Sequence, residues 1–194
     1  MAAEPPVDTS PEPGSGFDHR SDEELVAAAN RGDAEAFSAL YYRHRDWVAR
    51  LALRLTGQPD LALDVLQETF LYLLRKFPGF TLTARLHTFL YPAVKNLSIA
   101  ARRKADRFRS DPVELDGLPA PTSRPTTQRE ELAQALAMLS AEHREVLLLR
   151  FVDDLSLAEI AQALEVPLGT VKSRLHNALA LLRQDERTRS YFAP

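Results

Sequence analysis

The chain has 194 residues, of which 45% are hydrophobic and 26% are charged, the balance of a folded protein rather than a disordered one. It contains no cysteine, which excludes disulfides, a thiol nucleophile and cysteine-ligated metal centres. A formal net charge of −3 argues against a general nucleic-acid coat protein, which is usually strongly basic. The acidic, proline-rich N-terminal stretch is not a signal peptide, and no apolar run is long enough for membrane insertion.

Two clusters of prolines predict how the chain is organised. Of 13 prolines, four lie within the first thirteen residues and four more lie between Phe108 and Gln128. Proline lacks an amide donor and has a fixed φ, so such clusters do not continue helices or central strands. We therefore predict a disordered tail over 1–20, a domain over 21–107, a linker over 108–127 and a second domain over 128–190.

The first predicted domain shows only helical signals. Ser21 and Glu24 fit a capping box, and Asp33 can cap a long helix that ends at Thr56-Gly57. Pro59 suits the first turn of the next helix, which ends before Pro78. Thr83 is the expected cap of a fourth helix over 84–107, which Pro92 interrupts. Apolar residues recur at steps of three and four, which is helical periodicity.

The second predicted domain consists of four short helices. The first contains Leu132, Leu136 and Leu139, and the second spans 141–151. Ser156 and Glu159 form another capping box, and Glu165-Val166-Pro167 separates that helix from a last one over 168–182. We predict an all-α fold, with two small helical domains on a flexible proline-rich linker and a helix-turn-helix in the second.

The last predicted helix has the composition of a DNA-reading helix. From Val166 to Arg183 there is no acidic residue, and three cations give +3. Polar residues that can contact base edges or phosphates share its early turns: Thr170, Lys172, Ser173, Arg174, His176 and Asn177. The alternative is an ordinary amphipathic helical hairpin with a solvated face.

A second basic region precedes the linker. Between Arg85 and Arg109, seven cationic residues face a single acid, Asp106, which gives +6, and aromatic residues are interleaved. Cations neutralise phosphates and aromatic faces stack on unpaired bases, so this region suits partly single-stranded nucleic acid. The alternative is a solvated helix end whose aromatic residues, such as Phe89 and Tyr91, belong to the core.

Enzyme chemistry has little support. The five histidines lack metal-ligand spacing: His19, His44, His87, His143 and His176. The carboxylate pairs Asp33/Glu35 and Asp153/Asp154 are explained more simply by helix capping and by solvation in a loop. We expect no active site, no metal and no cofactor.

Together these segments identify a resemblance to the sigma-70 family of bacterial RNA polymerase initiation factors, specifically the two-domain extracytoplasmic-function (ECF) group. The matching words are GDAEAFSALYYRH, RLTG and DVLQETFLYLLRKF in the first domain and LSAEHREVLLLRFVDDLSLAEIAQALEVPLGTVKSRLHNALALLR in the second. The resemblance covers about residues 22–107 and 128–185.

The resemblance implies a role for each region. The helix-turn-helix would read the −35 promoter element through the six polar residues named above. The segment from Phe80 to Arg107 would open the −10 element and hold its non-template strand, through Phe80, Phe89, Lys95, Asn96, Arg102, Arg103 and Lys104. The surface that docks on the β′ subunit of polymerase would be Asp64, Val65, Gln67, Glu68 and Phe70. The residues alone instead predict that this helix buries Val65 and Phe70 and leaves the polar residues as a solvated face.

The implied partners are RNA polymerase core (its β′ and β subunits), promoter DNA and an anti-sigma factor, and the implied location is the cytoplasm.

Two departures from the family pattern weaken the −10 assignments. Phe89-Leu90 replaces a frequent Trp-Leu pair, and Asn96 is followed four residues later by Ala100 instead of Asp. Pro92 is also unusual there.

Two other functions stay open at this stage. A free-standing helix-turn-helix regulator would bind its operator without polymerase, whereas a sigma factor would need polymerase. An all-α enzyme or metal protein would use the scattered histidines and carboxylates, and a metal assay would test it.

Overall fold

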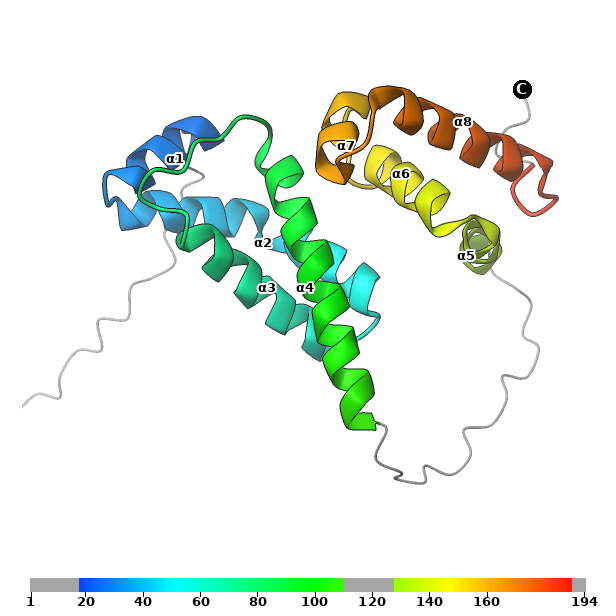
Figure 1. Ribbon diagram of the computed structural model, residues 1–194, viewed down its shortest axis with the longest axis horizontal. Helices are drawn as coiled ribbons and strands as arrows, with labels where there is room; N and C mark the ends of the chain where they lie inside the picture. Colours follow the sequence, from blue (N-terminus) through cyan, green and yellow to red (C-terminus); the bar gives the residue numbers. More distant parts are fainter. Residues whose placement is uncertain (1–17, 110–127, 190–194) are drawn as a thin grey trace, which may run out of the picture.

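The computed structural model describes residues 18–109 and 128–189, and within these ranges it contains eight helices and no strand. This confirms the predicted all-α class. The helices are α1 (Asp22–Asn30), α2 (Ala34–Thr56), α3 (Pro59–Leu74), α4 (Leu86–Arg109), α5 (Gln128–Met138), α6 (Ala141–Phe151), α7 (Leu157–Leu164) and α8 (Leu168–Gln184) (Figure 1). Within the same ranges, no helix is long and apolar enough to cross a bilayer. Most of the predicted tail and linker lies outside the described residues.

Both predicted capping boxes form, and they set the starts of α1 and α7. The Ser21 hydroxyl accepts the Glu24 N–H at 3.2 Å while the Glu24 carboxylate accepts the Ser21 N–H at 2.7 Å. Ser156 and Glu159 repeat this reciprocal pair before α7. Each box satisfies two backbone groups that would otherwise lack helical partners, so the short helices begin at defined residues.

The start of α4 differs from the prediction. Thr83 does not cap it; instead, the Arg85 carbonyl accepts the N–H groups of Thr88 (2.9 Å) and Phe89 (3.3 Å). The helix therefore begins at Leu86, two residues later than expected, and continues through Pro92 to Arg109. The missing N–H of Pro92 costs one hydrogen bond to the preceding turn without ending the helix.

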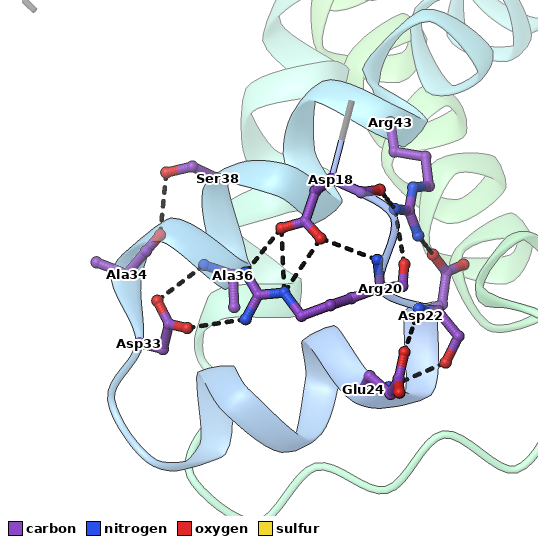
Figure 2. A network of polar contacts seen from close by, with 10 residues as sticks. Asp18, Arg20, Asp22, Glu24, Asp33, Ala34, Ala36, Ser38 and Arg43 are labelled. Atoms are coloured by element: carbon purple, nitrogen blue, oxygen red, sulfur yellow. Dashed lines mark hydrogen bonds and ion pairs between the residues drawn. The ribbon is translucent and has the colours of Figure 1, made fainter. Parts of the chain in front are cut away.

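Residues 18–20, which the sequence assigns to the tail, are held against the start of α2. The Arg20 guanidinium lies between Asp18 (2.7 Å) and Asp33 (3.1 Å), and Arg43 reaches both the Asp18 carbonyl (2.7 Å) and Asp22 (2.7 Å) (Figure 2). The charge-assisted bonds of two arginines thus order the chain before α1. The contacts of the first bundle thus include residues that precede the predicted domain start at residue 21.

Helices α1 to α4 form the N-terminal bundle, in which α2, α3 and α4 pack on one another and α1 packs on α2. Its interior consists of apolar residues at helical spacing: Leu25, Leu40, Val48, Leu51, Val65, Phe70, Leu73, Leu86, Leu90 and Val94. The C-terminal helices bury a second set, of which Val146, Leu149, Ile160 and Val171 are almost completely inaccessible. The helix-turn-helix α7–α8 packs on α6.

The two bundles are in direct contact. Helix α4 lies between the other N-terminal helices and α6–α7, and it packs against α7 (Figure 1). One continuous buried apolar cluster includes residues of both bundles, from Leu25 in α1 to Val171 in α8. The predicted two-domain organisation is therefore present here in a closed arrangement.

Candidate nucleic-acid and polymerase interfaces

Helix α8 presents a polar face opposite its buried one. Val171, Ala178 and Leu182 are buried, whereas Lys172, Ser173, His176 and Asn177 are exposed. Thr170 and Arg174 are half-buried at the edge of this face, and Arg174 forms a 2.9 Å ion pair with Glu142 of α6. The structure thus brings together four of the six residues predicted to face DNA and places the other two beside them.

The start of α8 is open to an anion. Pro167 occupies the N-cap position without a side-chain cap, and the first turn contains no acidic residue. The positive end of a helix dipole and its unpaired N–H groups attract phosphate. The polar face and the helix start together form a surface on which a duplex can be held and read.

Four of the predicted −10 residues lie exposed along α4: Asn96, Arg102, Arg103 and Lys104. Lys95 is different, because its ammonium forms a 2.6 Å ion pair with Glu145 of α6. The predicted cation is thus paired with a carboxylate from the other bundle.

The two aromatic residues predicted to stack on bases pack on each other instead. Phe80 is buried, Phe89 is half-buried, and their ring centroids are 4.6 Å apart. Phe77 and Tyr72 extend this cluster, at 5.6 Å from Phe80 and 6.0 Å from Phe89. In this closed arrangement the rings fill space between α3 and α4, so the core alternative holds for Phe80.

The segment before α4 is held by Asn30, a residue that sequence analysis does not select. Asn30, at the end of α1, accepts the N–H groups of Gly79 (2.7 Å) and Phe80 (3.0 Å) and donates to the Phe80 carbonyl (2.8 Å). One side chain thus satisfies three backbone groups some fifty residues away. Gly79 has a φ of 103°, in the region that favours glycine, so the loop turns sharply at this point.

The predicted docking face on α3 contains both exposed and buried residues. Asp64, Gln67 and Glu68 are exposed, but Val65 and Phe70 are 2% and 5% exposed and belong to the core, so the structure does not present them to a partner. They face inward because they lie on the apolar side of an amphipathic helix. Three exposed apolar residues that the prediction did not select lie beside the polar ones: Leu63, Leu71 and Leu74.

The acidic pair Asp153/Asp154 is not simply a solvated loop. The Asp153 carboxylate is 4% exposed, accepts the Trp47 indole N–H at 3.0 Å and forms an ion pair with Arg54. Both partners belong to α2, on the far side of the contact between the bundles. The sequence interpretation was wrong for Asp153, although Asp154 is exposed.

Two of the scattered histidines are neighbours in space. His44 Nδ1 and His87 Nε2 are 3.1 Å apart, and His44 Nε2 lies 2.9 Å from Asp22. The His87 ring stacks on Trp47 with centroids 4.1 Å apart. Burial, with the nearby His44, lowers the pKa of His87 to about 4. Even so, within residues 18–109 and 128–189 no group of three or more histidine or acidic side chains is arranged to hold a metal ion.

Two family models match the chain, one in each bundle. The Sigma-70 region 2 model matches residues 40–108 and the Sigma-70 region 4 model matches residues 129–182, so both bundles have a counterpart. The fold is shared with CnrH in its complex with the cytosolic domain of CnrY (TM-score 0.62, 23% identity, 82% of this chain and 93% of that one). It is also shared with RpoE of Bartonella quintana in complex with the anti-sigma factor NepR (TM-score 0.58, 24% identity, 78% and 96%).

Several ECF sigma factors are similar in sequence over most of the chain. The chain is 38% identical over 165 residues to the ECF RNA polymerase sigma factor SigL of Mycobacterium tuberculosis, covering 81% of this chain and 93% of the relative. It is 34% identical to SigM of the same species (92% and 91%) and 28% identical to SigW of Bacillus subtilis (84% and 95%). The chain belongs to the ECF sigma factors of the sigma-70 family, transcription initiation factors that direct RNA polymerase to promoters.

Proposed function

We propose that this sigma factor divides promoter recognition and polymerase binding among three surfaces: α8 for the −35 element, α4 for the −10 element, and the exposed side of α3 for polymerase. The observation that supports this most strongly is the exposed, acid-free polar face of α8. The bundles correspond to the proposed domains 21–107 and 128–190.

On α8, we assign base contacts to Lys172, Ser173, His176 and Asn177, because they are exposed together on one face. An amide and an ammonium can each read a base pair in the major groove through hydrogen bonds to its edge. Thr170 and Arg174 lie at the margin, where phosphate contacts position a recognition helix. The uncapped start of the helix adds a further phosphate site.

On α4, we assign contacts with the non-template strand to Asn96, Arg102, Arg103 and Lys104, which are exposed along the helix. Lys95, Phe80 and Phe89 would join them only after the bundles separate or the loop before α4 moves. Each base stacked on an aromatic ring contributes roughly 1–3 kcal/mol, which would offset part of the cost of unpairing it.

On α3, we assign polymerase contacts to Asp64, Gln67 and Glu68 and add the adjacent exposed leucines, Leu63, Leu71 and Leu74. An apolar strip bordered by polar groups is typical of a protein-binding surface. Val65 and Phe70 would support this surface from beneath.

The proposal also includes expectations about catalysis, location, regulation and the linker. We expect a regulatory protein without catalysis of its own, acting in the cytoplasm where its polymerase acts. An anti-sigma factor is the expected regulator, since the RpoE structure that shares this fold is a complex with one. The proposed linker of about twenty residues could extend to ~65 Å at ~3.3 Å per residue, which exceeds one turn of DNA.

Run-off transcription tests the proposal. Core polymerase with this protein should yield promoter-specific transcripts on a genomic template library, and core polymerase alone should not. The absence of any specific transcript would refute it. A footprint on DNA without polymerase would instead favour a free-standing helix-turn-helix regulator.

A further inference from the structure

The contact between the bundles pairs cations of the proposed −10 surface with acids of the C-terminal bundle. Lys95 of α4 pairs with Glu145 of α6 at 2.6 Å, and Arg85, just before α4, pairs with Glu159 of α7 at 3.2 Å. The Tyr91 hydroxyl, also on α4, donates to the same Glu145 carboxylate. Glu145 therefore holds two groups of α4 at once.

Tyr91 and Glu145 are largely shielded from solvent as well as paired, whereas the Arg85 side chain is 65% exposed. Tyr91 is 2% exposed, and burial together with the adjacent Glu145 carboxylate raises its pKa. The side chains of Lys95 and Glu145 are 37% and 20% exposed. A phosphate at Lys95 would compete with Glu145, because both are anions that bind the same ammonium.

The second part of the contact is more deeply buried. Asp153 bridges two residues of α2, Trp47 and Arg54, and its side chain is 4% exposed. Removing one partner from a buried charge pair leaves the other charge without compensation, which is far more costly than losing an exposed pair. Asp153 is thus the residue on which the closed arrangement depends most.

We propose that Asp153 and Glu145 hold the free protein in a closed, autoinhibited state in which the C-terminal bundle blocks part of the −10 surface. The inhibition is selective, because Lys172, Ser173, His176 and Asn177 of α8 stay exposed in the same arrangement. Separation of the bundles would release Lys95, Arg85 and Tyr91 together. This proposal rests on the proposed role of α4 in binding DNA.

The first test measures closure without DNA or polymerase. The chain has no cysteine, so Ser38→Cys and Gln184→Cys, both at exposed positions in different bundles, can be labelled for energy transfer. Asp153→Asn and Glu145→Gln should each lower the transfer efficiency relative to the parent. The matched control is Asp46→Asn, which removes one exposed carboxylate beside Trp47 whose ion pair stays within α2. Unchanged efficiency in both lock variants would overturn the closed state.

The second test measures inhibition. Binding of single-stranded oligo-dT to the polymerase-free protein should tighten at least about tenfold in Asp153→Asn or Glu145→Gln if the variant is mainly open and less than about a tenth of the parent is, since apparent affinity scales with the competent fraction. Asp46→Asn corrects for the loss of one negative charge. Lower energy transfer without tighter binding would refute autoinhibition. Failure of run-off transcription by the parent would refute the proposed function instead. Glu145→Gln keeps the test valid if Asp153→Asn does not fold, as judged by circular dichroism.

Discussion

The indole Nε1 of Trp47 donates a 3.0 Å hydrogen bond to Asp153, a residue 106 positions further along the chain. Trp47 belongs to the bundle that carries the proposed −10 surface, and Asp153 precedes the helix-turn-helix. The same carboxylate pairs with Arg54, so a single buried acid connects both halves of the molecule. Trp47 can therefore be used to follow the contact between the bundles, and substitution of Asp153 can be used to alter it.

Trp47 should report on closure by its fluorescence. It is the only tryptophan in the chain and is 7% exposed. In Asp153→Asn we expect a red-shifted emission and faster quenching by acrylamide, because opening brings water to the indole. Asp46→Asn should resemble the parent. Identical spectra for the parent and Asp153→Asn would show that this carboxylate does not keep the indole buried.

Asn30→Ala should destabilise the loop before α4. The variant leaves the N–H groups of Gly79 and Phe80 and the Phe80 carbonyl without their side-chain partner. Hydrogen bonds of this kind contribute about 0.5–1.5 kcal/mol each, so the loss of three should lower the free energy of unfolding by about 1.5–4.5 kcal/mol. Urea denaturation measures it. Asn96→Ala, an exposed asparagine on α4, is the matched control and should change the midpoint little; equal effects of the two variants would contradict the role of Asn30.

His87 should make folding sensitive to mild acid. Burial holds its pKa near 4 in the folded protein, below the 6.5 of an unperturbed histidine. The folded state thus disfavours the proton, so this contribution to stability is complete above pH 6.5 and is lost as the pH falls toward 4. The groups that face His87 are His44, Asp22, Arg85 and Glu159; at both carboxyls, hydrogen bonds and nearby positive charge outweigh burial and lower the pKa.

His87→Phe keeps a ring to stack on Trp47 but cannot titrate. We expect its unfolding free energy, measured in urea at several pH values, to fall less than that of the parent between pH 6.5 and pH 4. Parallel pH profiles for the two proteins would show that His87 is not the group responsible.

Local sequence signals predicted most of the fold, whereas contacts between distant segments were beyond their reach. The capping boxes at Ser21 and Ser156 each depend on residues three apart, and both form as predicted. Local signals place Asp153 in a solvated loop, because nothing within a few residues of it indicates Trp47. They likewise give no relation between His44 and His87, which are 43 residues apart.

The same difference between local signals and long-range contacts applies to the functional surfaces. Periodicity correctly separates the buried and exposed sides of α8, since one helix determines both. On α3, the family resemblance grouped Val65 and Phe70 with their exposed neighbours, although helical spacing alone places them with the core. The pairing of Lys95 with Glu145 depends on how the bundles pack, which no pattern within one helix encodes.

Substitutions on α3 should separate stability from polymerase binding. Phe70→Ala should lower the free energy of unfolding by about 3–5 kcal/mol, the usual cost of removing a buried aromatic ring. Gln67→Ala and Glu68→Ala, at exposed positions, should change it by no more than about 0.5 kcal/mol but weaken binding to core polymerase. Urea denaturation and a pull-down of core polymerase measure the two effects. Wild-type binding by the double variant Gln67→Ala/Glu68→Ala would place the docking surface elsewhere.

Substitutions on α8 should separate base reading from phosphate binding. Asn177→Ala should reduce discrimination between −35 sequences by about 1–3 kcal/mol if the amide reads a base edge. If Lys172 contacts a base, Lys172→Ala should also reduce this discrimination. If Lys172 contacts a phosphate, the substitution should weaken binding to all promoter sequences equally and lower the salt dependence of binding by about one ion. Binding of polymerase holoenzyme to promoter variants at several salt concentrations distinguishes these results. Gln184→Ala, at the far end of the helix, is the control, and promoter preference unchanged in both variants would refute the assigned DNA face.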